Sequence, residues 1–392
     1  MLARIQSALF LPAKSKLGGD HDWWLIGISA VMLCLGLVMM SSASVAIAER
    51  LHDSPFYFLY RQLGFLAIGV VLAVIMLRIP MEIWNKLGPA LLLAGVVMLI
   101  VVMIPGVGRT VNGATRWISL GIFNLQISEL IKVVMLIFMA SYLTRRGDKL
   151  RTHLSGILIP MGALSLVAVL LLLQPDFGTT VVIGSFSMGL LLLAGMRIGH
   201  FVVLCTLVTG AMFALAKAAP YRWERVTGFM NPWADPFDSG FQLSQSLIAF
   251  GRGEFFGVGL GGSVQKLFYL PEAHTDFIYA VLAEELGFVG ALVVIVLFGL
   301  FMWRSVVISR AAEARGDRFS SYLAVGIGLW FVFQAYVNIG VNMGVLPTKG
   351  LTLPLMSYGG SSLMASIAAL VLLLRIDYEN RHGKLSGSKD SR

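Results

Sequence analysis

Residues 276–302 read DFIYAVLAEELGFVGALVVIVLFGLFM, and this stretch decides the fold class. It is long enough to cross the hydrocarbon core of a bilayer, which takes about 20 helical residues. Its charged residues are Asp276, Glu284 and Glu285, all in its first half. Because the bilayer core offers backbone amides no water, such a stretch must form a helix. The sequence therefore predicts a membrane protein and excludes a soluble globule.

The rest of the chain repeats this pattern. Of its 392 residues, 57% are hydrophobic and 13% are charged, against about 25% charged in an ordinary soluble domain. We therefore predict an all-α polytopic membrane protein with ten transmembrane helices. The predicted spans are residues 23–44, 60–78, 84–104, 126–144, 155–174, 178–196, 199–217, 276–302, 321–340 and 359–375.

The orientation follows from the distribution of Lys and Arg. They are about twice as frequent in the segments on one side of the predicted spans, and the richer side is normally cytoplasmic. Both termini are thus predicted to be cytoplasmic. The expected organisation is an N-terminal arm (1–22), a single ten-helix membrane domain (23–375) and a cytoplasmic tail (376–392), with one long extracytoplasmic loop (218–275) between spans seven and eight.

The long loop is rich in aromatic residues, which anchor proteins at membrane interfaces. Within it, Leu243, Leu247, Ile248 and Phe250 fall on one side of a short amphipathic helix. We expect the loop to lie flat on the outer leaflet. A lid that seals the bundle and a surface that binds substrate both fit this description.

The predicted outer face is unusually basic, since external loops normally avoid Lys and Arg. One explanation is an anionic ligand. The other is that these basic residues pair with acidic residues of the same face, which are Glu224, Asp235, Asp238, Glu254 and Glu272.

Two groups of charges lie inside predicted spans. Glu129 and Lys132 are three residues apart, so they share one helical face and can pair. Such a pair has a functional role or fixes helix packing. Glu284 and Glu285 are adjacent, so at least one must face the interior of the bundle or be protonated.

Three polar motifs stand where spans meet the outer face. Asp176, in the turn QPDFGTT, is expected to cap the following helix. Asp276, in PEAHTDF, is either a cap or a reactive carboxylate. Ser361 lies in SYGGSSL at the start of the last span, which either offers free amides to a phosphate or permits close helix packing.

Six runs of residues stand out along the chain: GATRWISLG (113–121), QPDFGTT (174–180), NPWADPF (231–237), SQSLIAFGRG (244–253), LPEAHTDFIYAVLAEELGFVG (270–290) and LPTKGLTLPLMSYGGSSL (346–363). Together they resemble the SEDS family of bacterial cell-wall synthesis, over all ten predicted spans. In this family's pattern QPSE, the chain has Ile127 instead of proline, which is expected to loosen the start of span four but to spare Glu129 and Lys132. The fifth and sixth runs resemble division-type more than elongation-type members.

The resemblance implies a peptidoglycan glycosyltransferase in the bacterial cytoplasmic (inner) membrane, at the division septum. Its substrate would be lipid II, a disaccharide-pentapeptide on undecaprenyl pyrophosphate. The family's essential acid falls on Asp276. The implied partners are a class B penicillin-binding protein (a transpeptidase) and other septal membrane proteins, with membrane lipid around the bundle and no nucleic acid.

The residues present suit that reaction. An inverting transfer needs one base on the incoming hydroxyl, and a pyrophosphate leaves without a proton once its charge is neutralised. Asp276 is the predicted base. The candidate substrate-binding residues are Arg116, Glu129, Lys132, Arg252, Lys266, His274, Lys349 and Ser361.

Two other functions are consistent with a ten-span bundle: a lipid II flippase and a non-catalytic scaffold of the division machinery. Many transporters show internal repeats, and none is visible here. No cofactor is predicted, since His274 is isolated from other metal-binding side chains. A divalent cation, Mg²⁺ or Mn²⁺, that bridges pyrophosphate to Asp176, Glu129 or Asp276 is left open.

Overall fold

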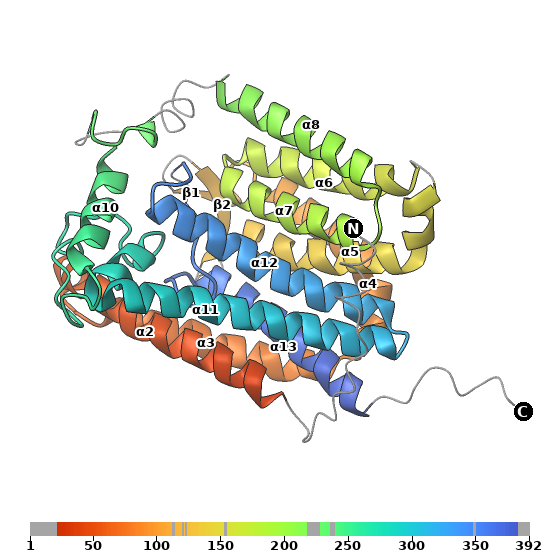
Figure 1. Cartoon of the computed structure of the whole chain (residues 1–392), viewed down its shortest axis with the longest axis horizontal. Helices are drawn as coiled ribbons and strands as arrows, with labels where there is room; N and C mark the ends of the chain where they lie inside the picture. Colours follow the sequence, from red (N-terminus) through yellow and green to blue (C-terminus); the bar gives the residue numbers. More distant parts are fainter. Residues whose placement is uncertain are drawn as a thin grey trace, which may run out of the picture.

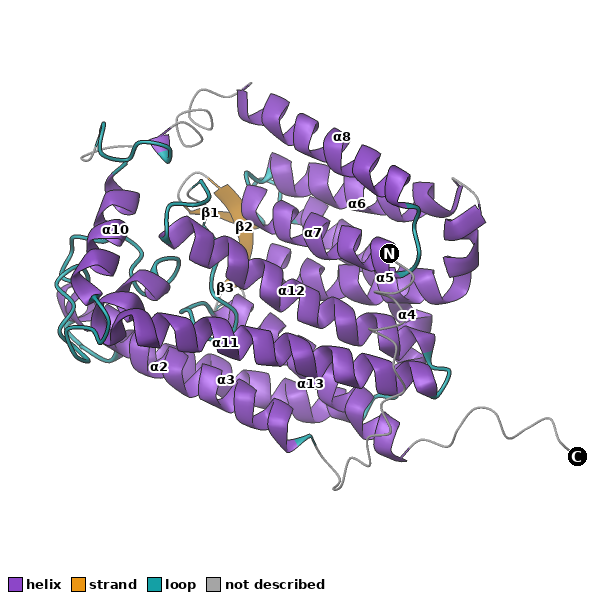
Figure 2. Cartoon of the chain, viewed as in Figure 1, coloured by secondary structure: helices purple, strands orange, loops and turns teal. Residues whose placement is uncertain are grey.

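The computed structural model describes residues 22–111, 114–119, 121, 124–152, 155–217, 228–235, 240–347 and 350–382. Long helices run side by side, and a small sheet and most of the loops lie near one end (Figures 1 and 2). Among the described residues, eight helices are long and apolar enough to cross a membrane, and Phe177–Leu193 and Ile198–Gly210 are shorter apolar helices. The chain is therefore built as a polytopic membrane protein.

A helix lies at each of the ten predicted spans, and the predicted amphipathic helix is α10. Helix α13 continues past residue 375, where the last span was expected to end. The helices before residue 220 are α2 (Trp23–His52), α3 (Tyr57–Leu77), α4 (Met81–Val101), α5 (Ile127–Thr152), α6 (Ser155–Leu173), α7 (Phe177–Leu193) and α8 (Ile198–Lys217). Those after it are α10 (Phe241–Gly253), α11 (Ile278–Ala314), α12 (Arg318–Asn342) and α13 (Gly360–His382).

The all-α prediction missed a three-stranded antiparallel sheet between α4 and α5. Its strands, in the order β1-β2-β3, are β1 (Gly108–Val111), β2 (Ala114–Ser119) and β3 (Asn124–Gln126). This segment lies outside the apolar stretches, so the bilayer does not force it into a helix. Asn-Gly between two strand segments is a strong hairpin signal, and the sequence carries it at Asn112-Gly113, between Val111 and Ala114.

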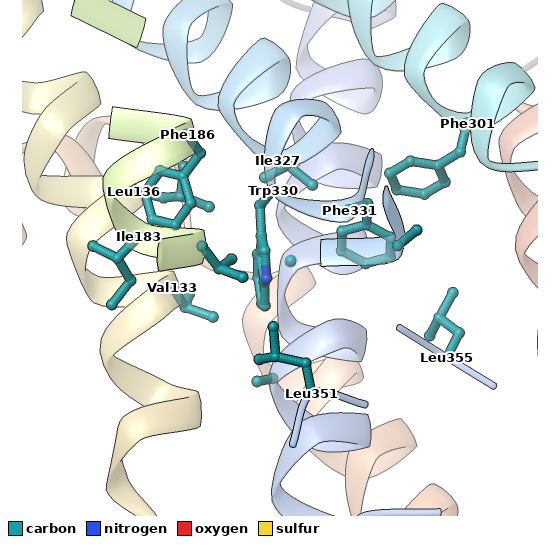
Figure 3. Close-up of a cluster of buried hydrophobic side chains, with 14 of the residues drawn as sticks. Val133, Leu136, Ile183, Phe186, Phe301, Ile327, Trp330, Phe331, Leu351 and Leu355 are labelled. Carbon is teal, nitrogen blue, oxygen red and sulfur yellow. The ribbon is translucent and has the colours of Figure 1, made fainter. Parts of the chain in front are cut away.

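The apolar core surrounds α12. Trp330 is fully buried, and Figure 3 shows it between side chains of α5 and α7 on one side and Phe331 on the other. The ring of Phe331 stacks on Phe301 of α11, with ring centroids 4.4 Å apart. Packing on both sides fixes the position of α12 in the bundle, with α5, α7, α11 and α13 as its neighbours.

Helix α11 is interrupted at Gly287, whose backbone has φ 66° and ψ −165°. The loop after α10 packs into the interruption, where Val258 and Gly259 donate backbone hydrogen bonds to the carbonyls of Glu284 and Glu285. A Cβ on Gly287 would lie 2.4 Å from the Gly257 nitrogen, so only glycine fits there. The break thus fixes the loop against the first two turns of α11.

Close packing also joins α2 to the segment before α13, and it predicts the effect of a single methyl group. In Gly36→Ala, the new Cβ would lie 2.4 Å from the Cα of Met356. Overpacking of this kind costs about 1–3 kcal/mol, so the midpoint of thermal unfolding in detergent should fall by several degrees. Gly27→Ala, on the same helix, meets nothing within 4 Å and should leave the midpoint unchanged or slightly raised. Equal midpoints for the two variants would contradict the packing.

Candidate active site

Asp276 lies just before α11, where the long loop joins the bundle. The N-cap of α11 is Phe277, and no side chain caps the helix. Among the described residues, the Asp276 carboxylate forms no hydrogen bond and no ion pair. Asp276 is therefore not a helix cap, which was one of the two roles open from the sequence.

The surroundings of Asp276 favour its protonated form. Burial raises the pKa of the Asp276 carboxyl from 3.8 to about 7. The negative charge of Glu272 also raises this pKa, whereas the positive charge of Arg116 lowers it. A carboxyl group with a pKa near 7 exchanges its proton at neutral pH, which suits a general base.

Arg116, on β2, connects the sheet to the turn between α6 and α7. Its Nε donates to the Gln174 carbonyl at 2.8 Å, and its Nη2 donates to the Pro175 carbonyl. Its Nη1 lies 3.9 Å from Oδ1 of Asp176. Asp176 caps α7 as predicted, since Oδ1 accepts the backbone N–H of Thr179 at 3.2 Å.

Glu129 and Lys132 form the predicted pair within α5. The Lys132 Nζ lies 2.8 Å from Oε2 of Glu129, and the lysine side chain is fully buried. Nζ also donates to Oε1 of Gln334 at 2.9 Å and lies 5.1 Å from the centroid of the Trp330 ring. The pair therefore links α5 to α12 in the core.

Arg252 and Lys266 are held by the two adjacent carboxylates of α11. Glu284 and Glu285 are both fully buried, as expected for at least one of them. The Lys266 Nζ lies 2.7 Å from Oε1 of Glu285, and Nη1 of Arg252 lies 3.6 Å from Oε1 of Glu284. Ser42 of α2 accepts a further hydrogen bond from Lys266 at 2.8 Å. The partners of these two basic residues are not the acidic residues that the sequence suggested.

His274 and Ser361 make contacts within the protein. The His274 side chain is buried. The centroid of its ring lies 4.7 Å from that of Phe58 and 5.5 Å from that of Tyr358. Burial lowers the pKa of His274, so the ring is neutral at pH 7. Ser361 Oγ accepts the backbone N–H of Gln126 at 2.9 Å and thereby links α13 to β3.

The segment that follows Lys349 lies against Asp276. Lys349 itself falls outside the described residues. A Cβ on its neighbour Gly350 would lie 3.0 Å from Oδ2 of Asp276. The structure therefore brings together Asp276, Arg116 and the segment from residue 350, which are far apart in the sequence.

Three buried amide side chains lie on the helix behind Asp276, and the sequence did not lead us to predict them. Gln334, Asn338 and Asn342 lie on α12 at most 1% exposed. Their spacing of four residues on an apolar helix was a usable signal, because it puts polar groups on one face. Among the described residues, no three His, Cys, Asp or Glu side chains are grouped to hold a metal ion.

Together these features define a class: a polytopic membrane protein with a carboxyl group of raised pKa, that of Asp276, at one end of its helical bundle. A family model described as "Cell cycle protein", of the FtsW, RodA and SpoVE group, matches residues 22–382. The chain belongs to this family.

Relatives and solved structures match over nearly the whole chain. The probable peptidoglycan glycosyltransferase FtsW of Nitrosococcus halophilus is 51% identical, over 96% of this chain and 98% of that protein. The protein of the same name in Coxiella burnetii is 49% identical, over 94% of this chain and 99% of that protein.

Two solved structures are also similar. A chain in the structure "Structural coordination of polymerization and crosslinking by a peptidoglycan synthase complex" has a TM-score of 0.75 and 33% identity, over 92% of this chain and 98% of that chain. The rod shape determining protein RodA of Thermus thermophilus has a TM-score of 0.66 and 29% identity, over 93% of this chain and 98% of that chain.

The buried pair Lys266–Glu285 predicts a loss of stability when one partner is neutralised. Glu285→Gln leaves the Lys266 charge uncompensated in the interior, and breaking a buried pair in this way costs about 3–5 kcal/mol. The unfolding midpoint in detergent should therefore fall clearly. Glu82→Gln is the matched control, because Glu82 pairs with Lys86 at 2.7 Å on the exposed surface and such pairs contribute about 0–1 kcal/mol. Similar midpoints for both variants would show that the Lys266 pair has no structural role.

Proposed function

We propose that this protein polymerises lipid II into β-1,4-linked glycan strands, with Asp276 as the general base. The observation that carries the assignment is the Asp276 carboxylate, which lacks a hydrogen-bonding or ionic partner among the described residues and has a pKa of about 7. The relatives of about 50% identity that are named peptidoglycan glycosyltransferase support the activity.

The reaction joins two disaccharides at the anomeric carbon. The 4-hydroxyl of the incoming N-acetylglucosamine attacks the anomeric carbon of an α-linked muramyl pyrophosphate, and the bond from that carbon to the pyrophosphate oxygen breaks. The new bond is β, so the configuration inverts. Asp276 takes the proton of the attacking hydroxyl, and the pyrophosphate leaves with the bonding electrons. It needs no proton if nearby cations stabilise its charge.

Arg116 and Lys349 are the basic residues that we assign to the pyrophosphate. Arg116 is close enough to Asp276 for its charge to influence the pKa of that carboxyl. Lys349 directly precedes Gly350, and Gly350 lies against the Asp276 carboxylate. We give Arg252 and Lys266 a structural role, because Glu284 and Glu285 compensate their charges and neither shifts the pKa of Asp276. Arg116 also lies near a carboxylate, that of Asp176, but it does shift this pKa. Contacts within the protein likewise account for Glu129, Lys132, His274 and Ser361.

The proposed membrane arrangement follows from the distribution of charge. All ten apolar helices cross the inner membrane, residues 1–22 and 376–392 are cytoplasmic, and the loop 218–275 and Asp276 face the opposite side. This places Asp276 where an exported lipid-linked sugar would arrive. The description of the family as a cell cycle protein supports a place at the division septum, and the similarity to a chain of a peptidoglycan synthase complex supports a class B penicillin-binding protein as a partner.

Asp276→Asn tests the assignment, because it replaces the base with a nearly isosteric amide. Glycan strands made from purified lipid II in detergent should decrease at least about 100-fold, the scale of a lost general base. Asp53→Asn is the control, since Asp53 is the exposed C-cap of α2 at φ 51°, a backbone conformation that asparagine accepts. Polymerisation that persists in Asp276→Asn would exclude the base role. Translocation of labelled lipid II without strand formation by the wild-type protein would indicate a flippase.

The pKa of Asp276 predicts how the rate depends on pH. Only the ionised carboxylate accepts a proton, so kcat/KM should rise with pH and reach half its maximum near pH 7. At pH 6, roughly a tenth of the molecules would carry the active form. Initial rates of strand formation between pH 5.5 and 8.5 provide the measurement, with the fraction of folded protein checked at each pH. A profile that is flat or falls across pH 7 would contradict this role.

A further inference from the structure

Gln334, Asn338 and Asn342 form a row of amide side chains along one face of α12, which we call the amide row. The residues are four positions apart, so they lie above one another on the helix. All three are buried. Burying an amide is unfavourable unless its donors and acceptors are satisfied, so the partners of this row indicate what it holds in place.

Asn338 contacts two segments that are far apart in the chain. Its Nδ2 donates to the backbone carbonyl of Asp276 at 2.8 Å and also to the carbonyl of Leu351. A side-chain amide has two N–H hydrogens in a fixed fork, so it can serve two acceptors at once. This one group thus ties the residue assigned as the base to the segment whose Gly350 lies against its carboxylate.

The other two members of the row extend the same connection. Asn342 donates to the Asp276 carbonyl at 3.0 Å and accepts the backbone N–H of Ala280 at 3.1 Å, in the first turn of α11. Gln334 donates to the Thr352 carbonyl at 2.7 Å and accepts from Lys132. The carbonyls of Asp276, Leu351 and Thr352 lie outside helices and strands, so they need donors from elsewhere.

We propose that Asn338 is a positioning residue, which holds Asp276 in register with the segment 350–352 for the transfer reaction. The inference rests on the proposed function. Asn338 does not itself need to touch the substrate. It acts through the backbone of Asp276, and a displacement of about 1 Å at a reacting group can reduce the rate about 100-fold.

Asn338→Asp tests this role with little change in shape. An ionised aspartate has no hydrogen to donate and repels both carbonyls, and a protonated one has a single hydrogen. With purified lipid II, kcat should fall at least about 30-fold while KM stays within about threefold, because the substrate contacts remain. Asn342→Asp, which keeps the acceptor for Ala280 but loses the donor to Asp276, should show the same pattern with a smaller loss.

Asn380→Asp is the matched control. The Asn380 Nδ2 also donates to a backbone carbonyl, that of Ile308 at 3.0 Å, between α13 and α11. Loss of this hydrogen bond should lower the unfolding midpoint without changing kcat per folded molecule. Equal kcat values for Asn338→Asp and Asn380→Asp would overturn the positioning role. If Asn338→Asp is not recovered folded, the same comparison between Asn342→Asp and Asn380→Asp decides. Failure of the wild-type protein to make strands would instead refute the proposed function.

Discussion

A charge buried among apolar helices needs an opposite charge beside it, and this requirement organises the structure. Glu129 pairs with Lys132, Glu285 with Lys266, and Asp22 with Arg304. Each of these partners is almost inaccessible to solvent, where an uncompensated charge would cost several kcal/mol. Asp276 differs from them, since its carboxylate has no such partner among the described residues and its pKa rises to about 7. Burial, which demands pairing elsewhere, therefore raises the pKa of Asp276, and its proposed role as a base depends on this property.

The end of the bundle around Asp276 is assembled from segments that are distant in the sequence. Strand β2 supplies Arg116, which binds the carbonyls of the turn before α7. The interruption of α11 at Gly287 lets the loop after α10 hydrogen-bond to the helix backbone. The amide row of α12 then connects Asp276 to the segment at Leu351. Each of these contacts reduces the freedom of an irregular segment, and the proposed role of Asp276 as a base requires such restraint.

The structure also separates the basic residues into two groups. Arg252 and Lys266 resembled ligands for an anion in the sequence, yet they compensate Glu284 and Glu285. Arg116 retains an influence on Asp276 while it holds the α6–α7 turn. The proposed pyrophosphate site therefore uses neither Arg252 of α10 nor Lys266 of the loop that follows it. That loop is held against α11 by backbone hydrogen bonds from Val258 and Gly259.

The sequence alone determined the positions of the apolar helices, the amphipathic helix α10, the cap at Asp176 and the Glu129–Lys132 pair. These features depend on hydropathy, periodicity or spacings of three residues, which are local, and the bilayer imposes helix on any long apolar stretch. The sheet was not predicted, because the segment 108–126 lies outside the apolar stretches and the bilayer does not force it into a helix. Only the tertiary structure decided that Lys266 faces Glu285, that Asn338 binds two separate backbone segments, and that Asp276 lacks a partner among the described residues. Such contacts join residues far apart in the chain, and side-chain packing, which no local pattern encodes, sets them.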